Sequence, residues 1–223
     1  MNGKIMLSIG TITLVLLALA LAILLPGGRT VEQHPKLPWM LKLDESGQPT
    51  VFGVTLGKST LAEVRDNFQE QGITNLFVSP QRQFTLETYF QNLFLSGIKA
   101  DMVITLDLTQ SELESIYDRG LRISQLESGA KKVVLSSADL ESVKHSVIQH
   151  ITYIPAADLT QDLVLGRFGQ AGEQITEASG IVHWLYPEKG MDIALNPNGK
   201  EVIQYIAPVK FRELIKPLLE KQD

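Results

Sequence analysis

Residues 84–108 have the sequence FTLETYFQNLFLSGIKADMVITLDL, and this stretch decides the fold class. In its first part, apolar side chains recur at every second position, as in a strand with one buried face. Ser96-Gly97 then interrupts the pattern with a turn of the kind that joins antiparallel strands. We therefore expect two long strands, 84–95 and 98–108, in a half-buried antiparallel sheet. The face predicted to be mainly apolar carries Phe84, Leu86, Thr88, Phe90 and Asn92.

Helices are predicted on both sides of these strands. Thr60 with Glu63, and Thr109 with Glu112, have the spacing of a capping box at a helix start. Helices among antiparallel strands indicate the α+β class. Further helices are expected to begin near Ser136, Asp158 and Pro208. Further strands are expected at 51–54, 76–79, 131–135, 151–154, 173–176, 181–186, 191–195 and 201–206.

Two helical segments suggest an internal repeat. Residues 60–68 (TLAEVRDNF) and 160–168 (TQDLVLGRF) share Thr, Val and Phe at matching places. Any two amphipathic helices that follow a capping Thr agree at a few apolar positions, so chance agreement is the alternative. The repeat interpretation predicts two similar helix-plus-antiparallel-sheet modules, at residues 39–135 and 136–223.

The N-terminal residues predict a membrane anchor. From Ile5 to Leu25 the chain carries no charge, and ~20 apolar residues suffice for a helix to cross a bilayer. We expect a transmembrane helix within residues 1–28 and a proline-containing stalk at 29–38. A cleaved secretory signal is the alternative, but this run exceeds the usual ~7–15 residues of its apolar region. The short N-terminal tail favours a single-pass inner-membrane protein with a periplasmic C-terminal domain; a cytoplasmic domain is the other orientation.

Composition excludes several classes of function. The chain has no cysteine, which excludes lipid attachment at cysteine, disulfides and zinc–cysteine sites. Its formal net charge is −5, and no basic stripe is visible, which argues against nucleic acid or an anionic lipid surface as its partner. The four histidines lack metal-ligand spacing, and neither a Gly-x-Ser-x-Gly nucleophile motif nor a phosphate-binding glycine loop occurs. We predict no cofactor, no metal and no catalytic activity.

A family resemblance adds to this picture. Arg167-Phe168-Gly169, followed by residues 183–187 (HWLYP), 192–195 (DIAL) and 199–202 (GKEV), resembles the SmpA/OmlA, or BamE-like, envelope domain. The similarity covers residues 158–207, with a weaker second copy at 51–108. It implies a two-layer module that binds other envelope proteins without catalysis. Members are commonly held by a lipidated cysteine, which this chain lacks.

These observations give two hypotheses of function. The first is a non-catalytic interaction or scaffold module of the cell envelope, with Trp184, Tyr186, Pro187 and His183 as its speculative partner-binding residues, because Trp and Tyr are frequent binding hot spots. A core position for Trp184 is the alternative to contact. The second hypothesis is a small-molecule-binding protein or hydrolase with a cleft between the two modules. A weaker third is an inhibitor that presents a concave sheet to an enzyme.

Overall fold

The two long strands form the centre of the fold. A computed structural model describes residues 35–220, in which β5 (Phe84–Leu95) and β6 (Ile98–Leu106) make an antiparallel hairpin. Its register shifts between Phe90 and Leu93, where Asn92 has a left-handed backbone with φ of 55°. The predicted apolar face therefore ends at Phe90: beyond this bulge Leu93 and Leu95 are buried, while Asn92 is exposed.

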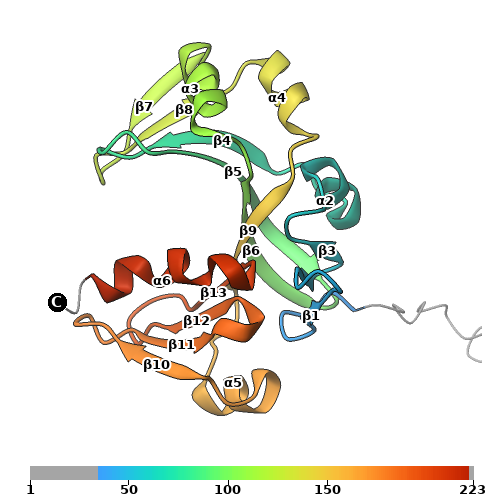
Figure 1. Ribbon diagram of the computed structural model, residues 1–223, viewed down its shortest axis with the longest axis vertical. Helices are drawn as coiled ribbons and strands as arrows, with labels where there is room; N and C mark the ends of the chain where they lie inside the picture. Colours follow the sequence, from blue (N-terminus) through green and yellow to red (C-terminus); the bar gives the residue numbers. More distant parts are fainter. Residues whose placement is uncertain (1–34, 221–223) are drawn as a thin grey trace, which may run out of the picture. The chain divides into compact units, whose positions relative to one another are not determined.

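Ten strands form one continuous antiparallel sheet (Figure 1). Their order across the sheet is β10-β11-β12-β13-β9-β6-β5-β4-β8-β7. The middle strand, β9, pairs with β13 on one side and β6 on the other. The remaining strands of the sheet are β4 (Ile73–Val78), β7 (Arg122–Gln125), β8 (Lys131–Val134), β9 (Ile148–Pro155), β10 (Glu173–Thr176), β11 (Val182–Tyr186), β12 (Met191–Leu195) and β13 (Val202–Ile206).

A small second sheet precedes the large one. It consists of β1 (Lys42–Leu43), β2 (Pro49–Val51) and β3 (Val54–Thr55). The turn between β2 and β3 places Phe52 against the large sheet, where its ring stacks on Tyr153 at 4.9 Å between centroids. Tyr205 lies beside it and donates a buried hydrogen bond to the Pro38 carbonyl at 2.8 Å. These contacts fix the start of the described chain on the middle strands.

Four helices contribute to the main core. They are α2 (Leu61–Phe68), α3 (Gln110–Asp118), α4 (Ser137–Val143) and α5 (Gln161–Phe168), and both predicted capping boxes form at the starts of α2 and α3. Val64, Ile116, Val143 and Phe168 all belong to the same buried cluster as one face of the sheet. Each helix is short, so this apolar packing rather than its own propensity stabilises it.

The last helix packs on the opposite face. After the 3₁₀ turns η1 (Pro187–Lys189) and η2 (Pro208–Lys210), α6 (Phe211–Leu219) buries Phe211 and Ile215. These two side chains form a second, smaller cluster with Leu185 and Ile206. In Figure 1, α6 covers β10 to β13 only. The same face of β4, β5, β6 and β8 carries no helix.

The predicted fold class is correct as α+β but wrong in its architecture. The expected pair of modules, each with its own sheet, is replaced by one sheet, because β9 pairs along its length with β6. Among residues 35–220, no helix is long and apolar enough to cross a membrane. The segment Ile5–Leu25, on which the anchor prediction rests, lies outside the described residues, so the predicted transmembrane helix is no part of the observed fold.

Candidate functional site

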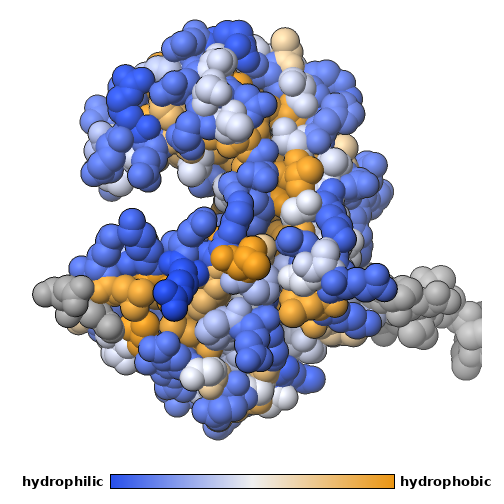
Figure 2. All heavy atoms as spheres, in the orientation of Figure 1, coloured by the Kyte–Doolittle hydropathy of each residue, from blue (hydrophilic) through white to orange (hydrophobic). Residues whose placement is uncertain are grey.

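The candidate site lies on the face of the ten-stranded sheet that carries α6. It is the half of that face that no helix covers. Directly paired residues share a face, so the register places its residues without ambiguity. A pocket of about 220 Å³ lies on it. Figure 2 shows that the molecule is hollowed here, between the part built on β4, β5, β7 and β8 and the part that carries α6. We call this surface the open face; its lining residues are Ile73, Asn75, Phe77, Glu87, Tyr89, Val103 and Lys132.

Apolar side chains are unusually exposed on the open face. Ile73 is 64% exposed at the start of β4, and Val134 on β8 is 40% exposed. Phe77 on β4 and Val103 on β6 are half-buried on the same face. Scattered apolar residues are normal on a protein surface, but several on one sheet face beside a hollow indicate an interaction surface.

A row of polar residues crosses the same face. Each member is directly paired with the next one on the neighbouring strand. From β4 through β5 and β6 to β9, the row consists of Asn75, Glu87, Thr105 and His150. Burial raises the pKa of Glu87, and a hydrogen bond from Thr85 only partly offsets the shift. Among the described residues, no lysine, arginine or histidine forms an ion pair with Glu87. A half-buried carboxylate of this kind is ready to accept a cationic partner group.

His150, at the β9 end of the row, has a strongly lowered pKa. Burial lowers its pKa from 6.5 to about 4, against the opposing effect of a hydrogen bond with the Gln204 side chain. Its Nε2 is sealed from solvent and has no hydrogen-bond partner. The imidazole is therefore neutral at physiological pH, and the row carries its negative charge at Glu87.

The rim of the open face is held rigid by Asp101. Its carboxylate accepts a hydrogen bond from the Tyr89 hydroxyl at 2.8 Å and another from the backbone N–H of Asn92 at 2.7 Å. Bonding to Asp101 also raises the pKa of Tyr89. The bulge and the aromatic side chain are thus fixed together, which keeps the tyrosine ring at the edge of the hollow.

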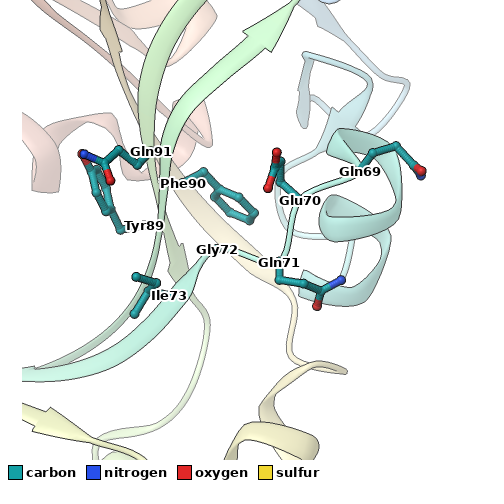
Figure 3. Close-up of a pocket in the computed structure, with 8 residues that line it drawn as sticks. All are labelled: Gln69, Glu70, Gln71, Gly72, Ile73, Tyr89, Phe90 and Gln91. Atoms are coloured by element: carbon teal, nitrogen blue, oxygen red, sulfur yellow. The ribbon is translucent and has the colours of Figure 1, made fainter.

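A second pocket of about 310 Å³ adjoins this rim and shares Ile73 and Tyr89 with the open face. Figure 3 shows that Tyr89 and Gln91 project from β5 to one side, whereas Phe90 turns toward the loop that carries Glu70. The other polar side chains of that loop point outward rather than toward a common centre. The pocket therefore lacks the convergent groups of a catalytic site.

The four predicted partner-binding residues do not form one surface. Two lie on one face of β11, one lies on the other face, and one follows the end of the strand. Trp184 is 3% exposed and belongs to the main core, and Tyr186 is 4% exposed on the same face. Pro187 is exposed and, with Tyr186, lines a surface pocket of about 410 Å³. His183 is buried on the opposite face. The structure thus brings together only Tyr186 and Pro187, and it makes Trp184 a core residue.

His183 lies between two carboxylates. Its Nδ1 is 2.9 Å from Asp192 and its Nε2 is 3.3 Å from Glu177. Burial lowers the pKa of His183, but the two carboxylates together outweigh burial and raise it overall. Both ring nitrogens are occupied, and the nearby Ser179 hydroxyl donates to Glu177 instead. The imidazole is thus held by two carboxylates rather than by a nucleophilic hydroxyl.

Among residues 35–220, no group of three or more histidine and carboxylate side chains is arranged to hold a metal ion. No known protein family, curated protein or solved structure matches the chain. The resemblance to the SmpA/OmlA domain therefore stays a prediction from the sequence.

Sequence reasoning did not find the open face. In the sequence, Glu87 and Tyr89 belong to the side of a half-buried strand that is opposite its apolar side. That side normally faces solvent. The signal that identifies them is the pairing of β4 with β8 and of β6 with β9, which gathers polar and apolar residues from distant segments. No local motif encodes that arrangement.

Proposed function

We propose that this protein is a non-catalytic interaction module of the cell envelope, and that its open face binds an amphipathic helix of a partner protein. The observation that carries the proposal is the unequal cover of one sheet face. α6 lies on one half of that face, whereas Ile73, Phe77 and Val134 are left in contact with solvent on the other half.

The dimensions favour a helix as the occupant. β6, β5, β4 and β8 are neighbours in the sheet, so at ~4.8 Å per strand the open face is about 19 Å wide. A helix with its side chains is ~10–12 Å across and fits on this width. α6 shows the packing mode, since its apolar side chains Phe211 and Ile215 already rest on the adjacent half. A partner helix beside α6 would continue the same layer.

Charge adds a second requirement. Glu87 is half-buried and has no cation paired with it among the described residues, so the partner helix is expected to place a lysine or arginine there. Such an ion pair adds specificity as well as affinity, because a wrong partner leaves the carboxylate buried and unpaired. The envelope location itself rests on the apolar run Ile5–Leu25 and on the SmpA/OmlA resemblance.

A small-molecule site is the alternative. The hollow beside the open face favours this alternative, because a small-molecule-binding protein or hydrolase needs a concave cleft. Its pocket of about 220 Å³, however, is smaller than the ~300–1,000 Å³ of typical ligand sites. His183 is buried, and both of its ring nitrogens face carboxylates. The protein-segment interpretation therefore fits the observations better.

Site-specific photo-crosslinking tests the proposal. A photoreactive amino acid replaces Ile73 in the full chain, and Val209, which is 89% exposed on η2, receives the same probe as the control. We expect a discrete protein adduct from position 73 that is missing from position 209, and mass spectrometry should map it to an amphipathic segment with a basic residue.

A synthetic peptide of the mapped segment then gives the decisive measurement. Ile73→Asp should weaken its binding at least tenfold, whereas Val209→Asp should leave the affinity unchanged. Far-UV circular dichroism checks that both variants stay folded. Equal adducts from the two positions, or equal peptide affinity of the two variants, would contradict the assignment of the open face.

A further inference from the structure

One end of the molecule combines an apolar groove with an exposed aromatic ring. The groove, of about 310 Å³, lies where the β5–β6 turn meets the start of the described chain and the end of β9. Its lining is mainly apolar and includes Trp39, Ile98, Leu159 and Leu163. Leu163 is 38% exposed although it belongs to a helix whose other face is buried. We call the groove, together with Phe94, Arg167 and Lys200 beside it, the end surface.

Phe94 is the most exposed aromatic residue in the described part of the chain. It is 71% exposed near the tip of the β5–β6 hairpin and is directly paired with Lys99, which lines the groove. Beyond the bulge, the neighbouring Leu93 and Leu95 are buried, so Phe94 is the one apolar side chain that this end of the strand turns outward. An apolar ring beside a lysine has the composition of a membrane-interface contact.

Basic groups surround the groove. The Arg167 guanidinium lies 4.8 Å from the centre of the Trp39 ring, and Lys200 donates a hydrogen bond to the carbonyl of the groove residue Ala156 at 3.1 Å. Lys99 adds a third cation. Asp158 is the acidic residue of the groove lining. Three cations therefore line or contact the groove residues, against one acidic residue in the lining, on a chain whose net charge is −5.

The chain enters the fold at the same place. Lys36 donates its backbone N–H to the Ser96 hydroxyl at the hairpin turn, and Pro38 lines the groove. The apolar run Ile5–Leu25 lies earlier in the sequence than these residues. Anionic headgroups attract such a cluster of cations within about one Debye length.

We propose that the end surface rests on an anionic bilayer, with Phe94 at the boundary between headgroups and acyl chains and with Lys99, Arg167 and Lys200 near the lipid phosphates. This placement goes beyond partner binding, because it fixes which end of the molecule faces the membrane. It also revises the exclusion drawn from composition: the cations are dispersed in the sequence and are gathered only by the fold.

The absence of cysteine makes a direct test simple, since a single introduced cysteine labels one site. Phe94→Cys carries an apolar aromatic fluorophore in place of the ring. Val209→Cys, which lies beyond the opposite end of β13 from Lys200, is the matched control. Each full-length variant is reconstituted into vesicles of phosphatidylcholine alone or of equal parts phosphatidylcholine and phosphatidylglycerol, both doped with nitroxide-labelled lipid.

In the mixed vesicles we expect the label at position 94 to be quenched several-fold more than the label at position 209. Lys99→Glu, phosphatidylcholine alone and high salt should each reduce quenching at 94 and leave 209 unchanged. Equal quenching at the two positions would overturn the proposal. Quenching at 94 that is indifferent to headgroup charge and to Lys99→Glu would overturn it as well. Circular dichroism of every variant confirms that a negative result is not loss of the fold.

Discussion

His150 should make the fold sensitive to acid. Its pKa is lowered from 6.5 to about 4 because the ring is buried and Nε2 has no partner. Between these two pH values the unfolded chain binds more protons than the folded chain, so stability falls as the pH falls. The shift corresponds to about 3 kcal/mol in all, of which about 2 kcal/mol is lost between pH 7 and pH 5.

His150→Gln removes this titration while keeping a polar side chain. Urea unfolding of both proteins, followed by tryptophan fluorescence at pH 7 and pH 5, measures the effect. We expect the unfolding free energy of the natural protein, minus that of the variant, to be about 2 kcal/mol lower at pH 5 than at pH 7. That is a large share of the ~5–15 kcal/mol typical of a domain.

Subtraction isolates His150 from other titrating groups. His183 has a raised pKa, so its own contribution is present below pH 6.5 and is lost as the pH rises through the raised value. It is the same in both proteins and cancels. A difference that is constant from pH 7 to pH 5, or an NMR titration of His150 with a pKa near 6.5, would refute the reasoning.

Four further changes test the fold. Gly190→Ala should cost about 3 kcal/mol or more, because φ is +64° and a Cβ would lie 1.9 Å from a β13 carbonyl oxygen. Gly166→Ala, in open space on α5, should instead stabilise by about 0.5–1 kcal/mol in the same urea titration. Tyr205→Phe should cost about 1–2 kcal/mol through the lost bond to Pro38, and proteolysis of the N-terminal segment should become faster. Thr109→Ala should cost about 1 kcal/mol by removing a cap, measured by thermal unfolding.

Local signals identified most elements. The alternation in residues 84–95 and the Ser96-Gly97 turn define β5 and its hairpin, and the capping pairs at Thr60 and Thr109 define two helix starts. β7 was missed because residues 122–125 have no buried side chain to leave a pattern. The strand predicted at 131–135 lies inside the sheet, since β7 pairs on its outer side. The proposed binding residues Trp184 and His183 are buried, and alternation alone does not predict this because it does not say which layer covers each face.

The sequence by itself determined the α+β class, the sites of the turns and caps, and the composition that lacks cysteine, because each depends on neighbouring residues. The tertiary structure decided that the strands form one sheet, that α6 covers only half of one face, and that Glu87 and His150 stand in one polar row. The physical reason is that strand pairing between distant segments depends on how all apolar faces are buried together. The open face and the end surface arise from that global solution, and no short stretch of sequence contains either of them.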